Sequence, residues 1–416
     1  MKFIDFAKKL LLLLKLCILG ALAGVLGGLV GTAFSYLLSF VTSLRESTPW
    51  LILLLPLGGV ITVLLYRGFK MDAHRGVNEI IPKLKSGSKI RAVAAPLIFV
   101  STAVTHLFGG SAGKEGAALQ IGGAGGAAVS DVLRLKGRCR TVFIMSGMCA
   151  LFASVFGTPL TALFFVLEFK VSKRTLPWAV LPCFIASMIA KKCASLSGVA
   201  DERMDISFTA SFSPLLILKI LALAAGLALV GVVMCFAFEK GRAWAKKAIP
   251  NALIRTLAFS LLIILLTAAV GDMRYNGSGM HMAFNAVEGN SDWYDFLLKI
   301  LFTAVTIAAG LKGGEIVPTF CVGATFGCFF GGLLGLDAGL AAALGLVGLF
   351  CCAANSFVGA VFLGFELFGL SVLPYAVLIC VPLWFLSSPD GLFENRLFTS
   401  PFLALRKKAV CTEKDI

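Results

Sequence analysis

Two carboxylates stand among glycines inside long apolar stretches of this 416-residue chain. Glu115 lies in the segment GGSAGKEGAALQIGG (residues 109–123), and Glu315 lies in the segment GGEIVP (residues 313–318). An ionised carboxylate is costly to hold in hydrocarbon, so a carboxylate found there is usually functional. Both glutamates are therefore candidates for the uptake and release of a proton.

The glycines before each glutamate predict that a membrane span is broken into two half-helices. The half-helix that begins near Glu115 would present free backbone N–H groups and its positive dipole end at mid-membrane. Such an end binds anions without a cationic side chain. Pro318 suits the first turn of a second half-helix. Two such starts that converge would form a desolvated anion site, which Glu115 could occupy when charged and leave when protonated.

Close helix packing, a phosphate loop and local ion pairs are the ordinary alternatives for these segments. Glycine-rich patterns often only let helices approach closely. The GKEG segment (residues 113–116) lacks the Ser or Thr that follows the lysine of a phosphate loop. Glu168 ends an apolar run and is followed by Lys170 and Lys173. We expect Glu168 to be an interfacial glutamate in a local ion pair.

An intramembrane enzyme that uses Glu115 and Glu315 as an acid/base pair is an alternative from a different class, and a structural membrane scaffold is another. No nucleophile elbow, zinc motif or pair of aspartates accompanies the two glutamates, which argues against an enzyme. A scaffold would not explain repeated mid-membrane glutamates. The 12 cysteines and three histidines show no metal-ligand spacing, so we expect no metal site and no cofactor.

The composition indicates an all-α polytopic membrane protein. Of all residues, 58% are hydrophobic and 14% are charged, against roughly 25% charged residues in soluble domains. A helix crosses the hydrocarbon core with about 20 apolar residues. Uncharged stretches of that order recur along the chain: Leu16–Leu44, Ala92–Gly113, Thr141–Leu167, Ile220–Phe238, Ile316–Leu336, Ala338–Phe365 and Leu367–Pro389.

The net charge of +15 reflects basic residues in short loops between apolar segments. Seven of them crowd one loop: Arg67, Lys70, Arg75, Lys83, Lys85, Lys89 and Arg91. Such loops mark the cytoplasmic side, which predicts a multi-pass protein of the cell inner (plasma) membrane, surrounded by lipid, with no nucleic-acid partner. The apolar run after Lys15 is too long for a signal peptide. We expect residues 1–15 to form a cytoplasmic amphipathic helix.

The first half of the chain reappears about 200 residues later. Gly110, Gly113 and Glu115 match positions 310, 313 and 315, where the same residue types stand. A repeat of this length in a membrane chain is typical of two-fold transporters, whose substrate site lies where the halves meet. The pattern predicts a first repeat over residues 16–205, a second over 206–400, and a cytoplasmic tail over 401–416. The spacing alone leaves parallel and inverted repeats open.

The segment Gly113-Lys114-Glu115-Gly116, followed by Gln120-Ile121-Gly122-Gly123, resembles the signature of the chloride-channel (CLC) family. The segment GEIVP (residues 314–318) stands in the place of the family's Gly-Ile-Phe-Ala-Pro, and GVNE (residues 76–79) in that of its Gly-Ser-Gly-Ile-Pro. The resemblance implies a fold of two inverted repeats with tilted and broken helices, and a homodimer with one anion path per subunit.

The resemblance also implies roles for residues of these motifs. Glu115 would be the gating glutamate, and Glu315 a possible proton-transfer residue. The anion would be bound by residues of three motifs and one late aromatic: Gly76, Val77, Asn78, Gly113, Lys114, Gly116, Gly314, Ile316, Val317 and Phe393.

Departures from the family pattern distinguish fluoride from chloride as the transported anion. Chloride members have a Ser at the position of Val77 and a Tyr at that of Phe393, and their exchangers have a second glutamate where this chain has Phe169. The absence of those hydroxyls, together with the presence of Glu315, resembles the pattern of the fluoride/proton antiporter branch. That branch, however, usually has a Met at the position of Val77 and a Thr at the position of Val317. The alternative is a chloride channel or chloride/proton exchanger of the same fold.

Overall fold

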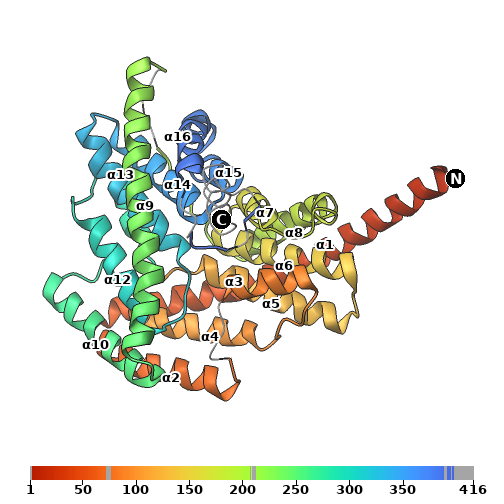
Figure 1. The fold of residues 1–416 in the computed structure, drawn as a ribbon, viewed down its shortest axis with the longest axis horizontal. Coiled ribbons are helices and arrows are strands. Elements are labelled where there is room, and N and C mark those ends of the chain that lie inside the picture. The colour runs from red at the N-terminus through yellow and green to blue at the C-terminus, as the bar shows by residue number, and fades with distance from the viewer. Residues whose placement is uncertain are drawn as a thin grey trace, which may run out of the picture.

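The computed structural model describes residues 2–71, 76–206, 208, 212–387, 391–394 and 396–397. The expected cytoplasmic tail, residues 401–416, lies outside these ranges. The described residues form sixteen α-helices and two short 3-10 helices (Figure 1). The predicted all-α architecture is therefore confirmed.

The described residues of each half form eight α-helices. Those of the first half are α1 (Lys2–Ser47), α2 (Leu55–Gly68), α3 (Val77–Ser86), α4 (Ala94–Leu107), α5 (Glu115–Val132), α6 (Gly137–Phe156), α7 (Pro159–Leu167) and α8 (Leu176–Leu196), with the 3-10 helix η1 (Pro49–Leu54) before α2. Those of the second half are α9 (Pro214–Ala248), α10 (Ala252–Val270), α11 (Met280–Val287), α12 (Asp295–Ala309), α13 (Ile316–Leu333), α14 (Ala338–Ala354), α15 (Phe357–Phe368) and α16 (Leu373–Leu386), with η2 (Leu370–Val372) before α16.

The same packing contact occurs in both halves. A Cβ added at Gly122 of α5 would lie 2.3 Å from the carbonyl oxygen of Gly147 on α6. A Cβ added at Gly323 of α13 would lie 2.3 Å from the carbonyl oxygen of Gly345 on α14. These glycines let paired helices touch backbone to backbone, as the close-packing interpretation of the glycine pattern expects.

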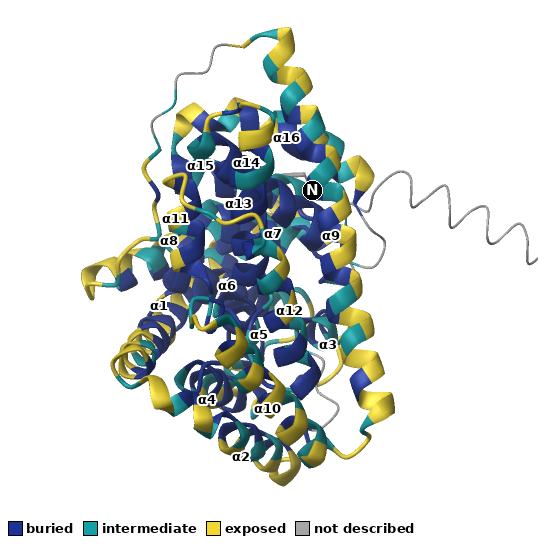
Figure 2. Cartoon of the chain, turned by 90° about the vertical axis from the view of Figure 1, so that its left-hand side faces the viewer, coloured by how far each residue is buried: buried dark blue, intermediate teal, exposed yellow. Residues whose placement is uncertain are grey.

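The core lies around α6 and α14, which are buried almost throughout (Figure 2). Large apolar side chains are exposed on the outer helices, for example Leu29 on α1, Leu229 on α9 and Leu265 on α10. Seven described helices are long and apolar enough to cross a membrane by length and composition. Exposed apolar faces on such helices suit contact with lipid rather than water.

Two helices, α1 and α9, are longer than a simple membrane span requires. α1 runs from Lys2 to Ser47 without a break, so the residues expected to form an N-terminal amphipathic helix continue directly into the long apolar helix. α9 is 35 residues long and lies along one side of the molecule (Figure 2). At about 1.5 Å per residue, α9 is longer than the hydrocarbon core is thick.

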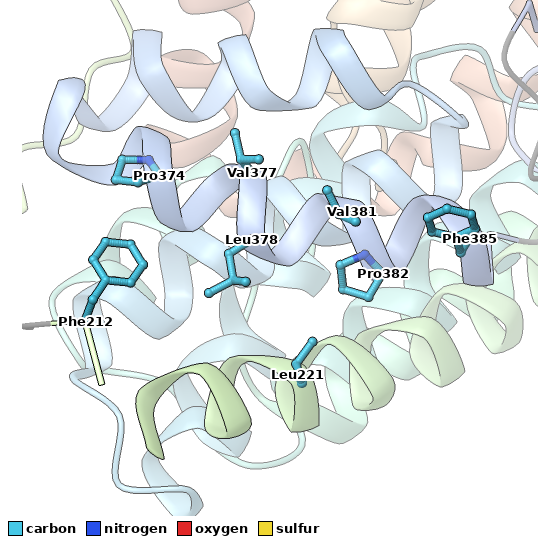
Figure 3. Close-up of a pocket in the computed structure, with 8 residues that line it drawn as sticks. All are labelled: Phe212, Leu221, Pro374, Val377, Leu378, Val381, Pro382 and Phe385. Atoms are coloured by element: carbon cyan, nitrogen blue, oxygen red, sulfur yellow. The ribbon is translucent and has the colours of Figure 1, made fainter. Parts of the chain in front are cut away.

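One apolar groove of about 560 Å³ lies between α9 and α16 (Figure 3). It is lined only by apolar side chains: Phe212, Leu221, Pro374, Val377, Leu378, Val381, Pro382 and Phe385. A groove without a polar donor cannot hold an anion stripped of its water. This groove is therefore not the predicted anion site.

Candidate anion site

The two glycine-rich segments meet as an isolated antiparallel bridge between Gly113 and Gly314. The amide of Gly113 donates to the carbonyl of Gly314 at 2.7 Å, and the amide of Gly314 donates to the carbonyl of Gly113 at 2.6 Å. The matching segments of the two halves thus run in opposite directions where they touch. α5 begins at Glu115 and α13 at Ile316, which confirms the predicted half-helix starts.

Glycine is required at this crossing because backbone packs on backbone. A Cβ added at Gly116 would lie 2.9 Å from the Cα of Gly314, and a Cβ added at Gly314 would lie 2.6 Å from the amide nitrogen of Gly116. Neither neighbour is a flexible side chain that could move aside. The close approach brings the free N–H groups of the two helix starts to one place in the protein.

Glu115 lies fully buried at this place, with none of its surface exposed. Its Oε2 accepts a hydrogen bond from the backbone amide of Lys114 at 3.1 Å. A Cβ added at Gly113 would lie 3.1 Å from that oxygen, 3.0 Å from Cβ of Val317 and 3.1 Å from Cδ of Pro318. The other oxygen, Oε1, is buried and has no hydrogen-bond partner within the described ranges. The carboxylate thus sits on the start of its own helix, beside the start of α13.

The Lys114 side chain reaches the loop between α8 and α9. Its Nζ lies 2.6 Å from Oε1 of Glu202 in that loop. The lysine of the motif therefore already has a carboxylate partner, and its contribution to the site is the backbone amide that reaches Glu115. Sequence reasoning gave no reason to single out Glu202.

Glu315 precedes the first turn of α13, but its carboxylate is turned away from that turn. Its side chain makes no capping hydrogen bond to the helix start. Instead, Oε1 of Glu315 pairs with Nη2 of Arg242, near the C-terminal end of α9. The Glu315 side chain is 21% exposed and that of Arg242 is 57% exposed. The N–H groups at the start of α13, on Ile316 and Val317, are thus not capped by the neighbouring carboxylate.

The start of α3 lies against α5 and against the segment that carries Phe393. A Cβ added at Gly76 would lie 3.1 Å from the side-chain amide of Gln120 on α5. The Asn78 side chain donates to the carbonyl of Leu392 at 3.3 Å and accepts from the amide of Glu394 at 3.0 Å. The structure therefore brings together the first motif and Phe393. Val77, between Gly76 and Asn78 in the first motif, is buried and supplies no hydroxyl.

A row of aromatic rings connects Phe393 with α13. The ring centroid of Phe393 lies 5.5 Å from that of Phe165 on α7, which lies 5.4 Å from that of Phe350 on α14. Phe350 in turn lies 5.2 Å from Phe320, in the first turns of α13. The guanidinium of Arg396 lies 4.0 Å above the Phe165 ring. No local pattern of residues indicates this row, because its rings come from four separate segments.

The expectation of a local ion pair for Glu168 is wrong. Glu168 is only 2% exposed. It accepts hydrogen bonds from the hydroxyl of Ser356 and from the amide of Val358 at 2.7 Å, both at the start of α15. In return, Glu366 of α15 accepts from two amides at the start of α7. The two glutamates thus cap each other's helices, because free N–H groups at helix starts favour a carboxylate.

Comparisons with known proteins agree with this geometry. A family model described as "Voltage gated chloride channel" matches residues 58–382. A "Chloride/fluoride channel protein" of Pseudomonas syringae pv. tomato is 33% identical over 384 residues, covering 90% of this chain and 85% of that protein. An "H(+)/Cl(-) exchange transporter ClcA" of Vibrio vulnificus is 26% identical, covering 84% of this chain and 81% of that protein.

Solved structures give the same result. The chain superposes on the "Crystal structure of a CLC-type fluoride/proton antiporter" with a TM-score of 0.87 and 32% identity, over 93% of this chain and 98% of that one. A slow cyanobacterial Cl⁻/H⁺ antiporter matches with a TM-score of 0.71 at 16% identity, over 96% and 99% of the two chains, and shares the fold alone. These findings set aside the intramembrane-enzyme alternative. The chain belongs to the voltage gated chloride channel (CLC) family.

Proposed function

We propose that this protein is a secondary active transporter that exchanges fluoride for protons and exports fluoride. The observation that carries the proposal is the crossing at Gly113 and Gly314, where two half-helix starts meet and each is accompanied by a glutamate. Such starts bind anions through backbone N–H groups. A carboxylate beside them gives the site a group that competes with the anion and carries a proton.

The gate in this proposal is Glu115. When ionised, its carboxylate remains on the start of α5, where it accepts from the Lys114 amide and takes the place of an anion. When protonated, it loses the attraction of the positive helix end and can leave that place to an anion. Proton uptake and anion entry at the α5 start are therefore linked, which is the requirement for exchange.

Fluoride suits the lining of this site better than chloride. Fluoride is small and strongly hydrated, so a site must replace its water with close N–H donors. The buried Val77 and the ring of Phe393 stand where the chloride members of the family have hydroxyls, and ring edges offer a weakly positive potential. The solved fluoride/proton antiporter is 32% identical to this chain and the chloride/fluoride channel protein of Pseudomonas syringae is 33% identical, whereas the chloride exchanger of Vibrio vulnificus is 26% identical.

Ion flux from liposomes tests the proposal directly. Purified protein is reconstituted with fluoride inside some vesicles and chloride inside others, and anion efflux and proton uptake are recorded together. We expect fluoride efflux to exceed chloride efflux at equal concentration, with protons entering as fluoride leaves. Equal fluxes of the two anions would favour the chloride channel or exchanger, and fluoride efflux without proton movement would favour a channel.

The assembly and orientation are part of the same proposal. The chain would form a homodimer with one anion path per subunit in the inner (plasma) membrane, with residues 67–91 in the cytoplasm. Single cysteines at Ser86 and Ser47, both exposed, report the orientation in a background cleared of reactive thiols. An impermeant reagent outside intact cells should label position 47 and spare position 86. Labelling of position 86 would reverse the orientation.

A further inference from the structure

The C-terminal end of α9 is rich in bases and reaches the water. Lys240, Arg242, Lys246 and Lys247 all lie in the last turns of this helix, and the Arg242 side chain is 57% exposed. Bases concentrated at one end of a span mark its cytoplasmic end. The ion pair between Arg242 and Glu315 therefore lies at the end of α9 that we assign to the cytoplasm.

Two attractions compete for the Glu315 carboxylate. One is the start of its own helix, because free N–H groups and the positive dipole end favour a carboxylate at the cap position. The other is the guanidinium of Arg242. In the structure the helix start makes no hydrogen bond with the Glu315 side chain, and the carboxylate is paired with Arg242 instead.

We infer that Arg242 is a positioning residue of the anion site: it holds the Glu315 carboxylate off the start of α13, and this leaves the N–H groups of that helix free for the anion. The inference rests on the proposed anion site at this helix start. It assigns to Arg242 an effect on the anion that is exerted through Glu315, since no contact places the guanidinium at the Gly113–Gly314 crossing. Without Arg242, the carboxylate would swing to its own helix start and compete with the anion.

Anion binding to purified protein in detergent, measured by isothermal titration with sodium fluoride and with sodium chloride, tests this inference. In Arg242→Gln we expect weaker binding of whichever anion the wild-type protein prefers. Affinity should fall about tenfold if the freed carboxylate occupies the helix start roughly 90% of the time. Arg242→Lys, which keeps the charge, should restore most of the affinity.

The background Glu315→Gln separates positioning from a general effect of charge. An uncharged side chain at position 315 does not compete with an anion, so adding Arg242→Gln to Glu315→Gln should leave the affinity unchanged. Lys246→Gln is the matched control, because it removes an exposed base from the same end of α9, and it should bind like the wild type. Because Arg242 is largely exposed, folding of its variant is expected, and size-exclusion profiles check it.

Each outcome decides the inference. Equal losses of affinity from Arg242→Gln with and without Glu315→Gln would show that Arg242 acts by its own charge, and no loss in Arg242→Gln would show that it does not act at all. Either result overturns the inference. Failure of the proposed function is seen separately, in wild-type vesicles that move no protons or do not prefer fluoride. The binding comparison between variants does not depend on that coupling.

Discussion

The starts of α5 and α13 share a backbone arrangement but place their glutamates differently. Both helices are 18 residues long, and their segments pair with each other through Gly113 and Gly314. Glu115 is the first residue of α5, whereas Glu315 precedes the first residue of α13. Each residue turns a helix by about 100°, so this difference of one position points the two carboxylates to different surroundings.

The difference in placement gives the two carboxylates opposite relations to the anion. Glu115 is fully buried and accepts from a backbone amide at the α5 start, so in the proposed mechanism it takes the place of an anion. Glu315 is partly exposed and paired with Arg242, so it leaves its helix start open. A symmetric backbone thus supports an asymmetric site, with one start occupied and the other available, which is what an exchanger of two different ions needs.

The largest effect on stability and anion binding is expected at the backbone contact between Gly116 and Gly314, where the starts of α5 and α13 meet. Gly116→Ala puts a Cβ 2.9 Å from the Cα of Gly314, and relieving that overlap would separate the helix starts. Overpacking of this kind costs about 1–3 kcal/mol of stability, and we expect loss of anion binding as well. Thermal unfolding in detergent and anion titration measure the two effects.

Gly125→Ala is the matched control for this substitution. Gly125 lies in the same helix, and no heavy atom lies within 4 Å of a Cβ added there. Its replacement by alanine should leave the anion affinity unchanged. The unfolding temperature should stay the same or rise slightly. If Gly116→Ala also unfolds and binds like the wild type, the close crossing is not what assembles the site.

The substitution Glu115→Gln tests whether Glu115, at the start of α5, couples the proton to the anion. Glutamine has the shape of the protonated carboxyl but cannot titrate, so the link between proton and anion should be lost. We expect no uphill anion movement on a proton gradient, with passive flux either retained or stalled. The measurement is anion flux into vesicles under an imposed pH difference. Glu288→Gln, at an exposed glutamate, serves as the control, and uphill transport by Glu115→Gln would place the gate elsewhere.

The sequence predicted the parts of the site that are fixed by local signals. Glycines before Glu115 and the proline at position 318 gave the helix starts, because glycine and proline act on the backbone at their own positions. Apolar runs indicated the long apolar helices. The division into two repeats stays a prediction from the repeated spacing. The resemblance of the Gly113–Gly116 segment to a family signature gave the fold and pointed to Val77 and Phe393.

The remaining contacts could not be predicted because they join distant parts of the chain. Glu315 and Arg242 are 73 positions apart, and the local sequence around either residue does not indicate the other as its partner. For Glu168 the local sequence indicates an ion pair with nearby lysines, whereas its hydrogen-bond partner Ser356 is 188 positions away. Side-chain partners of this kind follow from how helices pack, which local patterns do not specify.

The substitution Glu315→Ala tests whether the Glu315 carboxylate, before the start of α13, carries the proton. If this carboxylate carries the proton, its removal should abolish coupled transport, while the protein should still assemble because the side chain is partly exposed and its ion pair is worth about 1 kcal/mol or less. Coupled flux and size-exclusion chromatography measure the two outcomes. Glu239→Ala, at an exposed glutamate on α9, is the control. Normal coupled exchange by Glu315→Ala would remove this residue from the mechanism and leave Glu115 to act alone.

The smallest effect is expected at the other ion pair, between Lys114 and Glu202, which lie 2.6 Å apart. Glu202→Gln frees the lysine but frees no carboxylate, since Glu115 already sits on its own helix start. Anion affinity should therefore stay the same or rise slightly because a negative charge has been removed. Stability should fall, because the mostly buried Lys114 ammonium loses its carboxylate partner.

This result has the opposite sign to the one expected for Arg242→Gln, so the two variants together measure whether the helix starts differ. The same titration with sodium fluoride compares them, with Lys191 and Asp201 providing a control: this pair lies 3.1 Å apart in the same region, and Asp201→Asn removes an equal charge. If Glu202→Gln weakens anion binding as much as Arg242→Gln does, both ion pairs support the site in the same way. The contrast between an occupied and an open start would then be wrong, because each start would depend on its neighbouring ion pair to the same degree.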